Sequence, residues 1–245
     1  MAPKVEPPVR FGVLSFAMYH ANFWSLAIAN SDLAEFVGIW DDNPERGQSA
    51  AKEYNTEYWA DLDALLETCD AVAITSETLN HVELAERAAA KGCHMLVEKP
   101  LATTMQGCDR IEAAVRRAGV SFMQGFPKRF DPVNHELKRL VDDGELGRIT
   151  FMRIRHGHLY GLMGGVAHSG WPEDPMLSGG GALLDEGVHG ADFIRWMFGD
   201  PDAVTATISY PMGHQVENLG IAIFTFKDGL ICELAASNIF TAGDN

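Results

Sequence analysis

The sequence has little positive charge. Its 245 residues contain 34 Asp and Glu against 19 Lys and Arg, a formal net charge of −15. Nucleic acids and anionic membrane surfaces attract proteins through clustered lysine and arginine. This balance argues against both, and we predict that neither nucleic acid nor a membrane is a partner.

Long apolar runs are missing as well. No stretch reaches the length of about 20 residues that a membrane span needs, and the opening MAPKVEPPVR has no apolar signal-peptide core. We therefore expect a cytoplasmic protein. With 47% hydrophobic and 22% charged residues, the composition is that of an ordinary globular chain, long enough for two modest domains or one large one.

Metal-binding patterns are absent too. The four cysteines show neither a C-x-x-C motif nor zinc-type spacing, which predicts reduced, buried thiols. They are Cys69, Cys93, Cys108 and Cys232. His158, His168 and His189 could be imagined as metal ligands, but their separations match no zinc pattern. We therefore predict no bound metal.

Strand and helix patterns alternate over the first half of the chain. Apolar runs such as VRFGVLSF and DAVAITS are followed by helical segments such as HANFWSLAIANS and LNHVELAERAAAKG. This alternation is typical of an α/β fold with a doubly wound parallel sheet of the Rossmann type, which binds ligands beyond the carboxyl ends of its strands. We assign residues 1–125 to such a dinucleotide-binding domain.

The pattern changes at Gly125-Phe126-Pro127. A helical segment and the strand GRITFMRIRHGHL come first, and AVTATISY, NLGIAIFTF and GLICELAASNIF then read as strands separated by turns. We predict that residues 126–245 form a C-terminal α+β domain for substrate binding and oligomerisation. Its strands would run in succession in a mainly antiparallel open sheet with a helix laid on it. An open sheet offers a face for a homo-oligomer.

The most informative stretch is SGGGALLDEGVHGADFIRWMFG, from Ser178 to Gly199. After three glycines, a helical pattern places Asp185, His189 and Asp192 on one narrow stripe, at i, i+4 and i+7. Apolar residues cover most of the remaining circumference, so this helix should be buried. Buried ionisable groups need partners or a chemical task. The alternative is a polar stripe that faces a solvent channel.

Glycines are missing where a dinucleotide turn would need them, between the first strand and helix. Ser15-Phe16-Ala17-Met18-Tyr19-His20 stands in place of G-x-G-x-x-G, a weak signal by itself. Asp41 ends the second strand, where a carboxylate can accept hydrogen bonds from an adenosine ribose, and Asp42 beside it would repel a 2′-phosphate. The pair favours NAD over NADP, unless it merely begins the turn DDNP.

Glu98-Lys99-Pro100 closes the fifth strand of the first domain, at the edge where a nicotinamide would lie. A lysine there could bridge cofactor and substrate, and a depressed pKa would let it pass a proton. By itself, a Lys-Pro after a strand is more often a surface turn.

Together these segments resemble the Gfo/Idh/MocA family of nicotinamide-dependent oxidoreductases, which act mostly on sugars, polyols and related hydroxy compounds. The resemblance runs from Val9 to the C-terminus. Its marks are AAAKGCHMLVEKPLA (88–102), GFPKRFDP (125–132), GELG (144–147) and the glycine-rich helix.

This resemblance implies roles for individual residues. The family's E-K-P lysine falls on Lys99, beside Glu98, and its D-x-x-x-H pair falls on Asp185 and His189. The family's second-strand acid falls on Asp41. The resemblance also places Thr78 and His81, from SETLNH (76–81), beside the nicotinamide ribose. The predicted cofactor-binding residues are Ser15, Phe16, Ala17, His20, Asp41, Ser76, Thr78, His81, Glu98 and Lys99.

Departures from the family pattern concern the cofactor turn and the chain length. Ser15, Ala17 and His20 replace residues that are usually glycine or alanine, and Glu77 stands where proline is usual. These changes bear on cofactor affinity rather than on the fold. The family's C-terminal sheet normally continues beyond the point where this chain stops, at Asn245, so the sequence looks shortened.

We hypothesise that a secondary alcohol or lactol carbon of a sugar or polyol gives hydride to NAD, with His189 as general base, because histidine titrates near working pH. Asp185 would hold a neighbouring hydroxyl, and Asp192 would be structural. Lys99 would stabilise the developing alkoxide and anchor the nicotinamide ribose.

His156, His158 and Trp171 are further substrate-binding candidates. The two histidines alternate onto one face of a strand, and ordinary sheet surface is the alternative. Two rival functions stay open. One is a redox-neutral NAD-dependent glycosidase or lyase on the same scaffold, and the other is a non-catalytic sugar- or cofactor-binding module.

Overall fold

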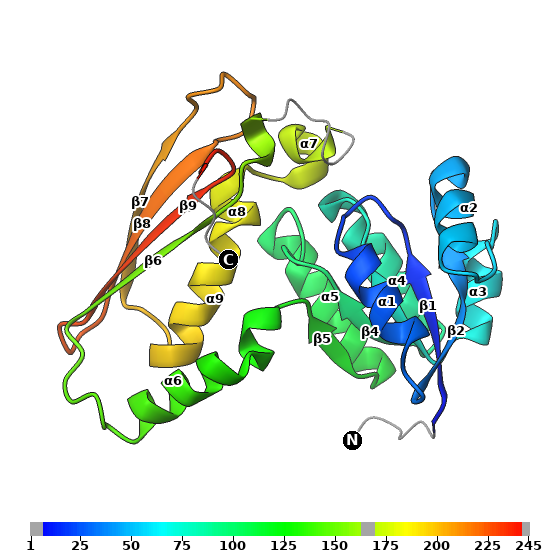
Figure 1. The fold of residues 1–245 in the computed structure, drawn as a ribbon, viewed down its shortest axis with the longest axis horizontal. Helices are drawn as coiled ribbons and strands as arrows, with labels where there is room; N and C mark the ends of the chain where they lie inside the picture. Colours follow the sequence, from blue (N-terminus) through cyan, green and yellow to red (C-terminus); the bar gives the residue numbers. More distant parts are fainter. Residues whose placement is uncertain (1–6, 163–169, 242–245) are drawn as a thin grey trace. The chain divides into compact units, whose positions relative to one another are not determined.

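The structure is a computed structural model that describes residues 7–162 and 170–241. The chain divides into two compact units, residues 1–125 and 126–245, each with a sheet of its own (Figure 1). Among the described residues, no helix combines the length and the apolar character needed to cross a membrane.

The first unit is built on a parallel sheet of five strands in the order β2-β1-β3-β4-β5. The strands are β1 (Val9–Leu14), β2 (Ala34–Trp40), β3 (Ala71–Ile74), β4 (His94–Val97) and β5 (Phe122–Gln124). The predicted Rossmann-type sheet is confirmed, and its order reverses between β1 and β3, where doubly wound sheets bind ligands. Glu98-Lys99-Pro100 follows the fourth strand, β4, so our numbering of that strand as the fifth was wrong.

Helices cover both faces of this sheet. The helices α1 (Ala21–Ala29) and α2 (Pro44–Glu53) pack on one face, and α3 (Leu62–Thr68), α4 (His81–Ala90) and α5 (Met105–Ala118) pack on the other. The neighbours Val13 and Leu14 enter opposite cores, because side chains alternate along a strand. Burial on both faces explains why these strands are continuous apolar runs in the sequence.

A local cap sets the start of α2 and the position of Arg46. The Asn43 side chain accepts hydrogen bonds from the backbone N–H groups of Glu45 and Arg46, and Pro44 occupies the first helical turn. Arg46 therefore stands at the beginning of the helix that follows Asp41. A 3₁₀ turn, η1 (Thr78–Asn80), lies between β3 and α4.

The second unit has a mixed four-stranded sheet in the order β6-β9-β8-β7. The strands are β6 (Phe151–Gly157), β7 (Ala203–Ser209), β8 (Leu219–Thr225) and β9 (Ile231–Ser237). The mainly antiparallel open sheet is confirmed, since β7, β8 and β9 pair antiparallel. The expected succession of strands is wrong for β6, which pairs in parallel with β9. Parallel pairing requires a long crossover, and the helical segment before β7 lies in that connection.

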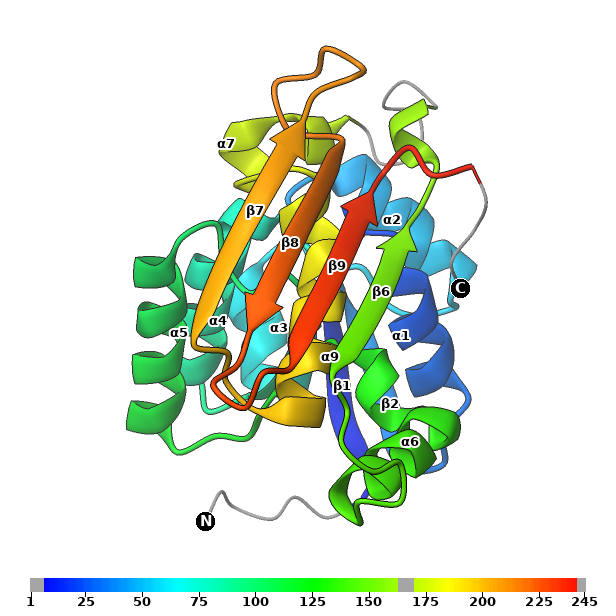
Figure 2. The same cartoon turned by 90° about the vertical axis from the view of Figure 1, so that its left-hand side faces the viewer.

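One helix, α9 (Gly187–Phe198), covers one face of this sheet, and Figure 2 shows the sheet face-on with α9 behind it. Ile194 of α9 packs with Cys232 and Leu234 of β9. The remaining elements are η2 (Pro127–Phe130), α6 (Pro132–Asp142), η3 (Tyr160–Leu162), η5 (Trp171–Glu173), α7 (Pro175–Ser178) and α8 (Ala182–Asp185).

The helix predicted across the glycine-rich stretch is interrupted. α8 ends at Asp185, α9 begins at Gly187, and Glu186 lies between them. The backbone N–H of His189 donates to the Glu186 carbonyl, three residues back instead of four, at 3.3 Å. The predicted burial is confirmed, because Arg195 alone is exposed within the described range 181–198.

All four cysteines are free, as predicted. Three are buried, and Cys108 is partly exposed. Burial raises the pKa of the Cys69 thiol to about 12, so this sulfur stays protonated and unreactive near neutral pH.

Candidate active site

The turn between β1 and α1 lacks the glycines of a dinucleotide turn but keeps a left-handed residue. Ser15 has a φ of 75°, in the left-handed region that glycine adopts most easily. Its hydroxyl accepts a hydrogen bond from Ala17 N–H at 3.2 Å. Among the described residues, no acceptor takes the backbone N–H of Tyr19 or His20, just before α1. These two donors remain available to an anion such as a pyrophosphate.

Asp41 lies at the end of β2 as expected, but its carboxylate is already saturated. Oδ2 accepts from Phe16 N–H at 2.7 Å and from Arg46 Nε at 2.8 Å. Oδ1 accepts from Asn43 N–H at 2.8 Å and from Arg46 Nη2 at 2.7 Å. A carboxylate offers about four acceptor positions. An adenosine ribose would therefore have to take the place of the Arg46 donors.

Arg46 is surrounded by acceptors, and sequence reasoning missed it. Its guanidinium contacts Ser15 Oγ at 3.1 Å, Asp42 at 2.8 Å and Glu77 at 3.5 Å, besides Asp41. Burial alone would lower the pKa of Arg46, but the carboxylates raise it above its ordinary value. Three carboxylates around one cation leave the region negative, which disfavours a 2′-phosphate and agrees with NAD.

A cavity of about 230 Å³ opens where β2 and β3 end. Its lining residues are Trp40, Asp42, Ser76, Asn80, Glu83, Leu84 and Arg87. The left-handed turn, the two open N–H groups and this small cavity beyond the strand ends suit an adenine dinucleotide. The residues present therefore fit NAD. Arg46 takes two of the acceptor positions of Asp41 that an adenosine ribose would use.

Ser76, Thr78 and His81 follow β3 and are nearly fully buried. The His81 ring lies between backbone carbonyls, with Nε2 at 3.2 Å from Ser76 O and Nδ1 at 3.1 Å from Pro100 O. Burial lowers the pKa of His81 although these carbonyls oppose the shift. The ring connects the loop after β3 to the loop after β4, and this geometry favours a positioning role.

Glu98 anchors the loop that carries Lys99. It is 1% exposed, and Oε1 accepts from Trp24 Nε1 at 2.7 Å. Oε2 lies 3.1 Å from His20 Nδ1 and accepts from Lys99 N–H at 3.1 Å. Burial alone would raise the pKa of Glu98, but His20, Lys99 and Trp24 hold it below its usual range. The His20 ring thus faces Glu98, and Lys99 is itself buried.

In the second unit, polar side chains gather where β6 ends and α8 meets α9. They are His156, His158, Tyr160, Asp185, Glu186 and His189. The rings of His156 and His158 lie 5.7 Å apart between centroids, so the alternation does place them on one face. The His156 ring also meets His189 edge-on at 5.2 Å.

His189 and His156 line a cavity of about 330 Å³ within this unit. The other lining residues are Lys128, Asn134, Ile154, Arg155, Gly190 and Phe193. This volume lies at the lower end of the range of small-molecule sites. An imidazole that is 7% exposed and faces such a cavity can exchange a proton with a bound hydroxyl group.

Asp185 and Asp192, which we predicted to share one stripe of the helix, contact different partners. Asp185 accepts a hydrogen bond from the Tyr160 hydroxyl at 2.5 Å, and burial beside this carboxylate raises the pKa of Tyr160 well above its ordinary value. The Asp192 carboxylate accepts hydrogen bonds from Nε and Nη2 of Arg129, at 2.8 and 2.7 Å, which suits a structural role.

Trp171 is buried in η5 and is not among the described residues that line the cavity. His168 lies outside the described residues.

Sequence reasoning missed Tyr160 and Glu186. The alternation of His156 and His158 continues to Tyr160 in HGHLY, which was a readable signal. Glu186 carried a weaker one, a second carboxylate next to Asp185 inside an otherwise apolar helix.

Two family models match the chain. The model described as oxidoreductase family, NAD-binding Rossmann fold, covers residues 9–126, and the GFO/IDH/MocA C-terminal domain covers residues 134–245.

Among curated proteins, the chain is similar to enzymes that act on inositols and sugars. An inositol 2-dehydrogenase of Saccharopolyspora erythraea is 34% identical over 69% of this chain and 45% of its own length. A 2,7-anhydro-N-acetylneuraminate hydratase of Mediterraneibacter gnavus is 30% identical over 76% of this chain and 49% of its own length. The chain thus spans about half the length of these relatives.

The WlbA dehydrogenase from Bordetella pertussis, solved with NADH and UDP-GlcNAcA, shares the fold with a TM-score of 0.89. It is 22% identical, and the match covers 99% of this chain and 70% of that one.

Proposed function

Because the chain belongs to the Gfo/Idh/MocA oxidoreductase family, we propose that it is an NAD-dependent dehydrogenase or reductase acting on CH–OH groups. Hydride would pass between nicotinamide and a secondary alcohol or lactol carbon of a sugar, polyol or related compound. The observation that carries the proposal is the buried His189 facing a cavity, in a chain whose first unit has the NAD-binding fold. The inositol dehydrogenase relative supports a polyol substrate.

The second unit would handle the substrate and its proton. His189 would accept the hydroxyl proton in oxidation and return it in reduction. Asp185, oriented by the Tyr160 hydroxyl, would hold a neighbouring substrate hydroxyl. His156, His158 and Trp171 would contribute further substrate contacts.

The first unit would hold the cofactor, which supplies the hydride acceptor or donor when bound. The turn from Ser15 to His20, including Phe16 and Ala17, would receive the pyrophosphate, and Asp41 the adenosine ribose. Ser76 and Thr78 would lie beside the nicotinamide ribose, positioned by His81. Lys99, anchored by Glu98, would hold that ribose and stabilise a developing alkoxide.

Replacing His189 tests the assignment. His189→Ala should lower kcat by about 10²–10⁴-fold, the usual contribution of a general base. The affinity for NAD, measured by calorimetry, should be unchanged, because the cofactor residues belong to the other unit. His135→Ala, an exposed histidine of α6, is the matched control. Wild-type turnover in His189→Ala would exclude this base.

A redox-neutral reaction on the same scaffold is the second candidate, and the hydratase relative favours it. Such an enzyme would oxidise its substrate transiently and reduce it back. It would consume substrate with tightly retained NAD and no net change in NADH absorbance. A dehydrogenase would accumulate NADH in proportion to product.

We also propose that the chain forms a homo-oligomer through the face of its second sheet opposite α9. The apolar residues Phe151, Ile221 and Ile231 are exposed on the strands of this sheet, and every residue of β7 is exposed. Light scattering should report a dimer or larger species that Ile221→Lys dissociates. A monomer at micromolar concentration would contradict the proposal.

A further inference from the structure

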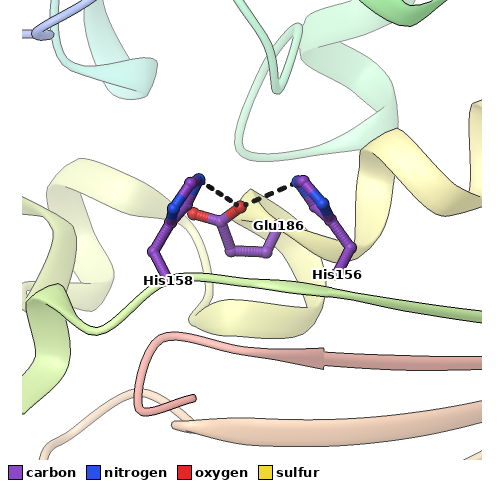
Figure 3. A group of neighbouring side chains, drawn as sticks. All are labelled: His156, His158 and Glu186. Atoms are coloured by element: carbon purple, nitrogen blue, oxygen red, sulfur yellow. Dashed lines mark ion pairs between the residues drawn. The ribbon is translucent and has the colours of Figure 1, made fainter. Parts of the chain in front are cut away.

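A buried carboxylate meets two imidazoles at the junction of α8 and α9. Glu186 Oε2 lies 3.3 Å from His156 Nε2 and 3.6 Å from His158 Nε2. Figure 3 shows the two rings on either side of Glu186, with both contacts converging on one oxygen. His156 lies in β6 and His158 directly follows it, so segments distant in the sequence build the group.

Glu186 has an unused acceptor at this point. The residue is 3% exposed, and Oε2 accepts no hydrogen bond from the described part of the chain. A buried carboxylate oxygen without such a bond is costly unless a cation compensates its charge. The oxygen points at the two imidazole nitrogens, and imidazole nitrogen is a common ligand of metal ions.

The separations match those of a coordinated metal. Bonds of about 2.0–2.2 Å at tetrahedral angles place neighbouring ligand atoms about 3.3–3.6 Å apart. Both N···O distances lie in this range, and all three ligand atoms lie within 4.8 Å of one another. The His158 side chain is 48% exposed, so its ring can rotate to close the third separation, and its exposure provides a route of entry.

We propose that His156, His158 and Glu186 bind a divalent transition-metal ion, with Zn²⁺ as the best match. Two imidazoles with one carboxylate suit Zn²⁺ or its first-row neighbours, whereas Mg²⁺ and Ca²⁺ prefer oxygen ligands. Three protein ligands leave a fourth position open, as in catalytic zinc sites. This inference goes beyond the proposed function, because metal binding requires neither NAD nor a sugar.

The site was not predicted, because the three ligands have no common sequence spacing. From the sequence, His158, His168 and His189 are the imaginable metal ligands, and no metal is expected. The structure groups His158 with His156 and Glu186 instead. The two histidines come together only if the H-x-H segment is extended as in a strand. The third residue, Glu186, lies at the break between α8 and α9.

The test is calorimetric titration of the chelator-treated full chain with Zn²⁺, and with Co²⁺ followed by visible absorption. We expect one equivalent to bind at micromolar concentration or below, with release of protons. Loss of an outer-shell partner costs about 10–100-fold in affinity, so Glu186→Gln and His158→Ala should each cost at least about 100-fold. Glu186→Gln preserves shape and His158 is half-exposed, so both variants should fold, as circular dichroism can verify.

His214→Ala is the matched control. His214 Nδ1 lies 3.6 Å from Glu173 Oε1 in the same unit, a comparable His–Glu contact outside the proposed group. Its substitution should leave the Zn²⁺ affinity unchanged. Absence of saturable Zn²⁺ and Co²⁺ binding would overturn the proposal. Equal binding in wild type, Glu186→Gln and His158→Ala would overturn it too.

Discussion

At the scale of single residues, Glu98 is closely enclosed by its neighbours. Its carboxylate is enclosed by Trp24, His20 and the backbone N–H of Lys99. A β-carbon added to Gly125 would lie 2.9 Å from Glu98 Oε1, so the surrounding backbone is fitted to this side chain. The glutamate of the E-K-P motif is therefore held in place by its neighbours and bonds the backbone of Lys99.

Glu98→Gln should destabilise the protein by about 1–3 kcal/mol at neutral pH, because it removes the charge from buried hydrogen bonds. The pKa of Glu98 is lower in the folded than in the unfolded protein. Its ionised form therefore stabilises the fold above about pH 4.3, and this stability is lost as the pH falls through the folded pKa. Urea unfolding of wild type and variant should converge at acid pH. A difference that is independent of pH would contradict this account.

Arg46 is predicted to compete with the cofactor for Asp41. Arg46→Met removes two of the four hydrogen bonds to that carboxylate, and an adenosine ribose could then replace them. We expect a lower melting temperature without ligand and a larger increase on addition of NAD than in wild type. Arg110→Met, at an exposed pair with Glu86, is the control. An unchanged NAD-induced increase in Arg46→Met would show that Arg46 does not occupy the ribose position.

The sequence located Asp41 and His189 because both follow from a strand end or a helical spacing that a family shares. It did not locate the Arg46 contacts, since these depend on the cap that starts α2. Glu186 was missed for another reason. Its contacts, His156 and His158, lie at the end of β6, far earlier in the chain, and no helical spacing relates them to Glu186.

At the scale of secondary structure, the glycine triplet before α8 has a steric cause. Gly179 ends α7 in the left-handed region, at a φ of 81°. A β-carbon on Gly181 would lie 2.0 Å from the backbone oxygen of Glu217, while Gly181 N–H donates to the Glu217 carboxylate at 2.9 Å. The close approach of these two segments fixes where α8 begins.

Gly181→Ala should therefore destabilise the protein by at least about 1–3 kcal/mol, because a backbone clash cannot be relieved by a side-chain rotation. Gly180→Ala is the neighbouring control. Its β-carbon would approach only the Leu184 side chain, at 3.1 Å, which can move. Chemical unfolding of both variants measures the difference. Equal stability of the two would show that Gly181 is not fitted to Glu217.

Alternation and periodicity predicted nearly every strand and helix, because these elements bury one face or two. Pairing was harder to predict. The place of β6 beside β9 depends on a crossover whose course no local pattern specifies. The break at Glu186 likewise depends on tertiary contacts, since the sequence alone continues the helical pattern through it.

At the scale of the whole molecule, each unit contains its own part of the proposed chemistry. The first has the strand order, the turn and the cavity that suit NAD, and the second has a cavity with His189. The chain spans about half the length of its curated relatives, so its activity has to be measured on this chain itself.

A screen of sugars and polyols with NAD, followed by NADH absorbance, tests the central claim most directly. The account predicts NADH formation with at least one polyol, with inositols as the first to try, and its loss in His189→Ala. Calorimetric binding of NAD to the same preparation serves as the control for a functional cofactor site. Binding of NAD without NADH formation from any member of the panel would contradict the dehydrogenase assignment.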